Sequence, residues 1–134
     1  MPKFSVQRIK EIDGKLKFYK LIKNNKCEFD DFEESCLNDP NYESEYIKIQ
    51  SIIQDVSDQK FSRLPKKKFK ELTGRKKSDT VKDFEVKSKH LRLYFFKDKL
   101  GNIIVLGGKK TSQKKDIRRF RSIKKEYLEE KENA

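Results

Sequence analysis

The sequence predicts an α+β fold: a small, twisted antiparallel sheet with an N-terminal helix pair and a C-terminal helix. Apolar and polar residues alternate near the N-terminus and again after residue 83, as they do in strands. Between these stretches, and again near the C-terminus, apolar residues recur at helical spacing. Strands and helices thus come in separate runs, which favours an antiparallel sheet. The 134 residues fit a single domain, 1–134.

Residues 5–23 predict a β-hairpin. Asp13 and Gly14 stand between two arms that both carry apolar residues, and an Asp-Gly pair in this setting is a strong hairpin signal. The second arm alternates regularly over residues 15–22, which fits a strand. The first arm also has apolar residues at helical spacing, but we interpret it as the partner strand.

Two helices are expected next, packed together as a helical hairpin on an apolar surface. The first covers residues 29–37 and ends before Pro40, because proline cannot continue a helix. The second covers residues 42–56 and places its apolar residues on one arc of about 120°. These residues are Tyr42, Tyr46, Ile49, Ile52, Ile53 and Val56.

Residues 60–82 predict a basic, mostly extended connector, followed by the strands of the sheet. The connector has four apolar residues as its expected anchors, namely Phe61, Leu64, Phe69 and Leu72. Residues 84–96 are rich in aromatic and β-branched side chains and are expected to form a strand. After a turn at 97–102, the continuous apolar run 103–106 predicts a central strand.

A C-terminal helix is expected to follow Gly107 and Gly108, which end the last strand. Thr111 or Ser112 can cap this helix, which runs to about residue 130. Its buried face is expected to contain Ile117, Phe120, Ile123, Tyr127 and Leu128. Beside that face, basic residues at i, i+4, i+7 and i+11 form a stripe of Lys114, Arg118, Arg121 and Lys125.

The charge of the chain predicts a polyanionic partner. There are 34 basic and 22 acidic residues, a formal net charge of +12, and only 34% of residues are hydrophobic. Such an excess favours nucleic acid, an acidic protein or an anionic membrane, and the alternative is a highly soluble surface. No segment reaches the roughly 20 apolar residues that cross a bilayer, and the N-terminus has no apolar signal region. We therefore expect a cytoplasmic protein with no membrane association.

Two cysteines, Cys27 and Cys36, are expected to be small buried apolar side chains. A disulfide between them is disfavoured, and two thiols alone make a poor metal site. The sequence also has no motif for metal-dependent hydrolysis or for acyl transfer. We therefore expect no metal ion and no other cofactor.

An arginine inside an apolar strand is the first candidate for a functional residue. Within the segment HLRLYFF, residues 90–96, strand alternation places Arg92 and Tyr94 on the face opposite the leucines. A guanidinium held on a rigid strand can clamp a phosphate and stabilise the charge that develops on it. The alternative is an ion pair between Arg92 and a local carboxylate, Asp83 or Glu85.

Two neighbouring features add to this candidate site. The segment GGKK, which ends in Lys109 and Lys110, allows close backbone approach and lies before a helix N-terminus, which favours an anion. Its alternative is a solubilising turn. His90, the one histidine of the chain, could transfer a proton near neutral pH, and its alternative is a structural or exposed side chain.

These features, in this order, resemble the RelE/ParE superfamily of bacterial toxins, and most closely its HigB-like, phage-derived branch. The resemblance is carried by the strand EVK…LRLYFF, a turn, an apolar strand that ends in GGKK, and a final helix that begins near Ile117. The segment from Phe69 to Gly74 resembles the family's lead-in to the sheet. The resemblance covers residues 61–130 and extends loosely to the earlier helix pair. It implies a RelE-like fold.

The resemblance implies the toxin of a type II toxin–antitoxin system, held by a cognate antitoxin protein. RelE- and HigB-like members cut mRNA in the A site of the 30S ribosomal subunit, without a metal, by attack of the 2′-hydroxyl on the phosphate. ParE-like members inhibit DNA gyrase instead. We therefore expect a metal-independent, ribosome-dependent endoribonuclease. The alternative is a non-nuclease member, either a gyrase inhibitor or an inactive binding protein neutralised by its antitoxin.

The resemblance also implies roles for individual residues. Arg92 matches the family's strand arginine, Lys87 matches a lysine on the preceding strand, and Lys110 matches the basic residue two positions past a glycine. These three are expected to hold the scissile phosphate and offset its charge. His90 or Asp116 is expected to move protons.

The chain departs from the family pattern at two positions. Glu85 stands where another strand lysine is expected, and the C-terminal tyrosine that serves some RelE proteins as a base has no match, although Asp116 falls near its place. The basic surface around the site is expected to bind RNA through Lys109, Lys114, Arg118, Arg121 and Lys125.

Overall fold

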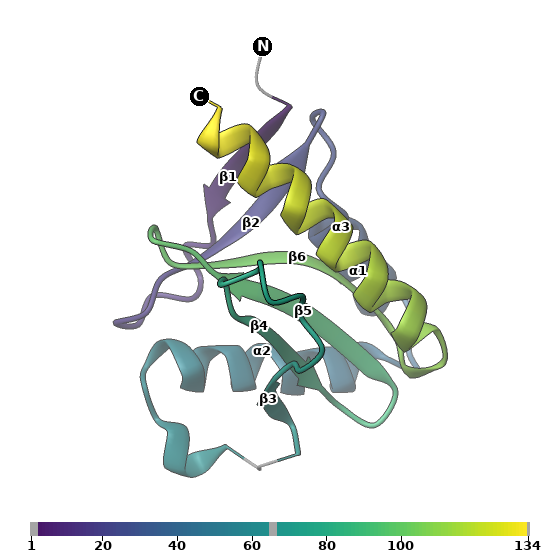
Figure 1. Cartoon of the computed structure of the whole chain (residues 1–134). Helices are drawn as coiled ribbons and strands as arrows, with labels where there is room; N and C mark the ends of the chain where they lie inside the picture. The colour runs from purple at the N-terminus through teal and green to yellow at the C-terminus, as the bar shows by residue number, and fades with distance from the viewer. Residues whose placement is uncertain (1–2, 65–66, 134) are drawn as a thin grey trace.

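A six-stranded mixed sheet forms the centre of the protein, and helices pack on both of its faces (Figure 1). The computed structural model describes residues 3–64 and 67–133. The strands are arranged in the order β1-β2-β6-β5-β4-β3. Their bounds are Phe4–Arg8 for β1, Phe18–Lys23 for β2, Phe69–Glu71 for β3, Asp83–Lys87 for β4, Leu91–Lys97 for β5 and Asn102–Lys109 for β6. The predicted α+β class is confirmed.

Three α-helices divide between the two faces of the sheet. Helices α1 (Glu28–Leu37) and α2 (Glu43–Ser57) pack on one face, and α3 (Gln113–Glu132) packs on the other. In Figure 1, α3 crosses in front of the sheet while α1 and α2 lie behind it. Two short 3-10 helices, η1 (Phe61–Arg63) and η2 (Lys110–Ser112), complete the described elements. The predicted helix pair and C-terminal helix are confirmed.

Each face of the sheet has its own apolar core, and β5 contributes to both. Leu93 and Phe95 pack with the helix pair, whereas Tyr94 and Phe96 pack with α3, as the predicted alternation requires. A β-bulge between β5 and β6 places Tyr94 opposite Leu106 and Phe95 opposite Ile104. The intervening residue, Val105, therefore joins Leu106 in the core under α3.

The sheet is mixed, so the prediction of a wholly antiparallel sheet is wrong for one pair of strands. Strand β2 pairs parallel with β6, with Phe18 opposite Asn102 and Lys20 opposite Ile104. The other pairs are antiparallel. Strand β6, the last in the sequence, lies inside the sheet, between β5 and strand β2 of the N-terminal hairpin. The order of helices and strands in the sequence does not determine where β6 lies in the sheet.

The predicted two-residue turn at Asp13 and Gly14 is also wrong, because the two strands of the hairpin are joined by the nine-residue segment 9–17. Gly14 instead packs on the end of α2. Its N–H donates to Ser57 Oγ at 2.9 Å, and a Cβ at this position would lie 2.5 Å from the same oxygen. Close approach, rather than turn geometry, requires the glycine here.

Three further boundaries differ from the prediction. The segment 84–96 is divided into β4 and β5 by a tight turn at Ser88, Lys89 and His90. Strand β6 continues through the two glycines to Lys109. The connector 60–82 contains a short edge strand, β3, which pairs with β4.

Of the predicted anchors in the connector, Leu72 is buried and the ring of Phe69 stacks on Phe84 and Phe95. Phe61 is 49% exposed, so its prediction as an anchor is wrong.

The buried side chains of α1 and α3 largely follow their predicted faces. In α3, Phe120, Ile123 and Tyr127 are buried, whereas Ile117 and Leu128 are half-buried. In α1, Cys36 is buried as expected; Cys27, just before the helix, is half-buried, and both thiols are free. None of the helices in the described part of the chain is long and apolar enough to cross a membrane.

Candidate functional site at one end of the sheet

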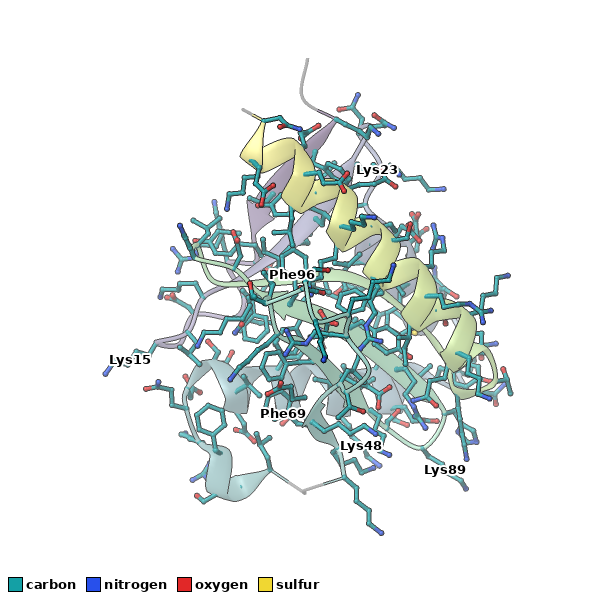
Figure 2. All side chains as sticks on the ribbon, in the orientation of Figure 1. Lys15, Lys23, Lys48, Phe69, Lys89 and Phe96 are labelled. Atoms are coloured by element: carbon teal, nitrogen blue, oxygen red, sulfur yellow. The ribbon has the colours of Figure 1, made fainter. Side chains whose placement is uncertain are left out.

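The predicted catalytic residues gather where the β4–β5 turn meets the junction of β6 with α3. The Lys110 N–H donates to the carbonyl of His90 at 2.8 Å, which joins these two segments. Arg92 on β5 lies opposite Lys87 on β4 and Gly108 on β6. Figure 2 places Lys89 at this end of the molecule and Lys15 at the opposite side. Antiparallel register therefore brings together residues that are separated in the sequence.

Arg92 is buried, with 5% of its surface exposed, and it has backbone partners. Its Nη1 donates to the carbonyls of Ser88 at 2.7 Å and of Leu91 at 2.8 Å. Its Nε has no partner among the described residues. Asp83 and Glu85, the carboxylates considered as alternative ion-pair partners, bind other residues. The guanidinium is thus held in place by carbonyl dipoles rather than by either of these carboxylates.

Glu85 and Tyr94 face each other across β4 and β5, next to Arg92. Glu85 is fully buried; one carboxylate oxygen accepts a hydrogen bond from Gln113 at 2.7 Å, and Lys70 Nζ lies 3.9 Å from the other. The Tyr94 hydroxyl is buried, and burial, together with the nearby Glu85 carboxylate, raises the pKa of this tyrosine. We refer to Glu85, Lys87, Arg92 and Tyr94 as the Arg92 cluster.

The Arg92 cluster holds unpaired buried polar atoms. In residues 3–64 and 67–133, the buried side-chain atoms without a hydrogen-bond partner are Glu85 Oε1, Arg92 Nε and Tyr94 Oη. All three come from adjacent positions on β4 and β5. Buried polar groups are nearly always paired in folded proteins, so this local concentration of unpaired atoms makes the Arg92 cluster a candidate site.

Asp116 approaches the same face of the sheet from the first turn of α3. Its Oδ2 accepts a hydrogen bond from Ser112 Oγ at 2.6 Å. A Cβ on Gly108 would lie 2.0 Å from this oxygen, so the glycine allows the carboxylate to reach the strand. Asp116 thus supplies an anion near the helix N-terminus, where the sequence predicted anion binding.

His90 and Lys109 lie with the helix pair rather than with the Arg92 cluster. His90 Nδ1 is 2.7 Å from Glu45 Oε2 on α2. Lys109 lies opposite Leu91, which faces the helix pair, and its ammonium sits 4.7 Å from the centre of the Tyr42 ring. The predicted catalytic residues therefore occupy two sides of the sheet end. Arg92 and Asp116 are on the α3 side, and His90 is on the other.

The predicted basic stripe on α3 is only partly available to a ligand. Lys114, Arg118 and Lys125 are exposed. Arg121 is half-buried, with its Nε 3.0 Å from Asp83 and its Nη2 2.7 Å from the carbonyl of Thr73. A groove of about 670 Å³ separates α3 from the segment 74–81. Its basic lining residues are Arg75, Lys76, Arg118, Arg121, Lys124 and Lys125, and its acidic ones are Asp79, Glu129 and Glu132.

A second group of buried charges lies beneath the later turns of α3, and the sequence did not reveal it. Lys124 is 1% exposed, and its ammonium donates to Asp79 at 2.7 Å, to Asp83 at 2.6 Å and to the carbonyl of Val81 at 2.5 Å. With Arg121 these residues form what we call the Lys124 cluster. One feature of the sequence could have indicated this cluster. Lys124 lies one helical turn after Phe120, which is buried, so both side chains fall on the same face of α3.

Glu45 was also missed, because nothing near it in the sequence indicates its contact with His90.

Within the described residues, His, Cys, Asp and Glu side chains form no group of three or more that could hold a metal ion. No protein-family model, curated protein or solved structure compared with the chain matches it.

Proposed function

We propose that this protein is the toxin of a type II toxin–antitoxin system and that it cuts mRNA on the ribosome as a metal-independent endoribonuclease. The resemblance to the RelE/ParE superfamily motivates the proposal. The observation that carries it is the Arg92 cluster. There, among the described residues, a buried guanidinium hydrogen-bonds to backbone carbonyls and lies beside a lysine and unpaired polar atoms at a basic end of the sheet.

The electrostatics of this cluster favour a phosphate. The pKa of Lys87 is lowered, first by burial and then by the positive charges of Arg92 and Lys70. Crowded cations of this kind are relieved by an incoming anion. A guanidinium is always charged, and its interaction with a phosphate strengthens where water is excluded. Arg92 and Lys87, together with the exposed Lys110, are therefore suited to offset charge on a phosphate under attack.

The proposed reaction is an internal transfer of the phosphate. The 2′-hydroxyl oxygen of a nucleotide forms a bond to the adjacent phosphorus, and the bond from phosphorus to the 5′-oxygen breaks. A base takes the 2′-hydroxyl proton, and water supplies a proton to the leaving 5′-oxygen. The products carry a 2′,3′-cyclic phosphate and a 5′-hydroxyl. His90 and Asp116 are the candidates for the base.

Exposed basic side chains on α3 support binding of a long polyanion near this site. Lys114 and Arg118 lie on the helix that begins beside Asp116, and Lys125 continues the same surface. Contacts of this kind neutralise phosphates and release counterions, so the affinity for RNA should fall steeply with salt. The partners of the proposed activity are mRNA on the 30S subunit and a cognate antitoxin.

The test is induced expression in bacteria of the wild type and of the double variant Arg92→Ala with Lys110→Ala, with growth and mapped mRNA 5′ ends as readouts. Lys10→Ala with Lys15→Ala is the matched control, because it also removes two positive charges but from an exposed loop on another side of the molecule (Figure 2). We expect growth arrest and new ends inside translated messages for the wild type and the control, and neither for the Arg92 variant.

A non-nuclease function is the second candidate, either gyrase inhibition or binding to an antitoxin without activity. The burial of Arg92 and the hydrogen bond that Ser112 makes to Asp116 favour it, because both reduce the groups that a substrate can reach. Growth arrest with intact messages would support a gyrase-directed toxin. Normal growth with a folded wild-type protein would support a binding-only protein and contradict the nuclease proposal.

A further inference from the structure

We propose that Glu45 is a positioning residue for His90, and that Nε2 of His90 is the atom that takes the 2′-hydroxyl proton. This inference rests on the proposed ribonuclease function and assigns its base. His90 and the Arg92 cluster lie on different sides of the sheet end, where the hydrogen bond from the Lys110 N–H to the His90 carbonyl joins the two segments. The inference therefore requires the substrate to pass around this end, from the Arg92 cluster to the N-terminal part of α2.

Both oxygens of the Glu45 carboxylate form hydrogen bonds with the β4–β5 turn. One oxygen accepts hydrogen bonds from Ser88 Oγ at 2.5 Å and from the His90 N–H at 2.8 Å. The other oxygen pairs with His90 Nδ1 at 2.7 Å. Only 13% of the Glu45 side chain is exposed, so the carboxylate has little freedom to leave these partners.

This contact determines which nitrogen of the imidazole is available. A carboxylate accepts hydrogen bonds, so Nδ1 of a neutral His90 carries the proton and donates it to Glu45. Nε2 is then left with its lone pair. The His90 side chain is 52% exposed, so this nitrogen can meet a substrate. A carboxylate that fixes the tautomer and stabilises the imidazolium is a known arrangement for a general base.

The surroundings of His90 suit a nucleotide. The Tyr42 ring packs edge to face on the imidazole at 6.2 Å between centres, and Lys109 holds its ammonium 4.7 Å from the Tyr42 ring centre. Tyr42 is half-buried. An aromatic ring beside an ammonium group can bind a base by stacking and a phosphate by charge.

Asp116, the other candidate, is less suited to accept the proton. Its Oδ2 already accepts a hydrogen bond from Ser112 and lies against Gly108 on the strand. In the assigned step, Nε2 of His90 takes the 2′-hydroxyl proton while the oxygen–phosphorus bond forms and the bond to the 5′-oxygen breaks. Water protonates the departing oxygen. Glu45 stabilises the resulting imidazolium through Nδ1.

The titratable side chains in contact with His90 come from the start of α2: Glu45 pairs with its ring nitrogen, and Tyr42, the N-cap, packs against the ring. Lys109 lies over the Tyr42 ring, and Lys110 meets His90 through a backbone hydrogen bond. Burial raises the pKa of Glu45, but the hydrogen bonds from Ser88 and His90 outweigh it and lower the value to about 2. Glu45 therefore stays charged at mildly acidic and neutral pH.

The first test measures the tautomer and needs no activity. Nitrogen-15 NMR of the folded protein near pH 8 should show a protonated Nδ1 and an unprotonated Nε2. Glu45→Ala should convert this to a mixture of tautomers. Glu43→Ala, which removes an exposed carboxylate from the same helix, should leave the spectrum unchanged. A wild-type Nε2–H tautomer, or no change in Glu45→Ala, overturns the inference.

The second test measures ribosome-dependent cleavage of a defined message. We expect His90→Ala to reduce the rate about 100-fold, with partial rescue by added imidazole. Glu45→Ala should reduce it about 10-fold, and the acid limb of the pH profile should disappear in His90→Ala. Full activity of His90→Ala beside an active wild type overturns the inference and leaves the proposed function standing. Absence of cleavage by the folded wild type, with the Nδ1–H tautomer observed, overturns both the function and the catalytic assignment.

Discussion

The Lys124 cluster and the Arg92 cluster both lie on the α3 face of the sheet, and they differ in how their charges are satisfied. Asp83 and Glu85 stand two positions apart on β4, and each belongs to one cluster. The Lys124 ammonium uses its three donors on Asp79, Asp83 and a backbone carbonyl. Within the described residues, three buried atoms of the Arg92 cluster, on Glu85, Arg92 and Tyr94, have no hydrogen-bond partner.

This difference identifies the Lys124 cluster as a structural element and motivates the proposal that the Arg92 cluster binds a ligand. Burying charge is favourable only when the partners compensate the lost hydration. The Lys124 cluster meets that condition and fixes the segment 73–83 to α3 through Arg121 as well. The Arg92 cluster does not meet it. Buried atoms without a hydrogen-bond partner reduce stability, and the proposed binding of a phosphate would supply partners for the donors among them.

The largest effect on stability should come from the Lys124 cluster. Lys124→Ala leaves the buried Asp83 carboxylate with Arg121 as its remaining charged partner, so we expect the free energy of unfolding to fall by about 3 to 5 kcal/mol. Urea denaturation followed by circular dichroism measures it. Lys125→Ala, one residue away and exposed, is the control and should change stability by less than about 0.5 kcal/mol. Equal effects of the two substitutions would show that the cluster is not structural.

The contact between Gly108 and Asp116 should have the next largest effect. Gly108→Ala places a methyl group where Asp116 Oδ2 now lies, and the required movement should destabilise the fold by about 1 to 3 kcal/mol. Asp116→Ala should recover most of this loss when the two are combined, since it removes the clashing carboxylate. A double-mutant cycle measures the coupling, and additive effects would contradict the contact.

Acid should weaken the link between α2 and the β4–β5 turn. The pKa of Glu45 is about 2 in the folded protein, below its ordinary value of 4.5, so its contribution is complete above pH 4.5 and is lost as pH falls toward 2. Between pH 6 and pH 3 the wild type should lose about 1 to 2 kcal/mol more stability than Glu45→Gln does. Urea unfolding at both pH values measures this difference, and parallel losses in the two proteins would refute it.

The smallest effect should come from Tyr94→Phe, because the hydroxyl it removes has no partner. We expect a change of less than about 0.5 kcal/mol, or a gain in stability. Tyr46→Phe is a matched control, since that tyrosine is equally buried but donates to Glu33 at 2.6 Å. The control should lose about 1 to 3 kcal/mol by the same unfolding measurement. A large loss in Tyr94→Phe would mean that the Arg92 cluster is structural after all.

The fold could be predicted wherever one local signal agreed with the packing. The apolar arc of α2 and the alternation that separates Leu93 from Tyr94 both gave the correct buried faces. The Asp13-Gly14 signal failed because a contact distant in sequence, between Gly14 and Ser57, determines the backbone there. Tertiary contacts override turn propensity in this way, and a single sequence does not display them.

The candidate site was predictable to the extent that it follows strand register. Arg92 lies opposite Gly108 because β5 and β6 form a hairpin, as the turn predicted at 97–102 implies. Its contact with Lys87 depends on the β4–β5 turn, which the single strand predicted over 84–96 did not contain. Glu45 and His90 are 45 positions apart and meet through the packing of α2 on the sheet, so the sequence offered no spacing to read. The burial of Lys124 was not predicted, because its partners Asp79 and Asp83 lie about 40 positions earlier and the connector has little periodicity.

The parallel pairing of β2 with β6 has a consequence for how the chain folds. Strand β6 lies between β2 and β5, so the sheet closes only by contacts between distant parts of the chain. Until Asn102–Lys109 has been synthesised, β1 and β2 can form only a two-stranded hairpin, which is marginally stable by itself. Contacts of long sequence separation also slow folding. A chain whose synthesis has stopped before β6 therefore contains Lys87 and Arg92 but lacks the strand that pairs with β5 beside them.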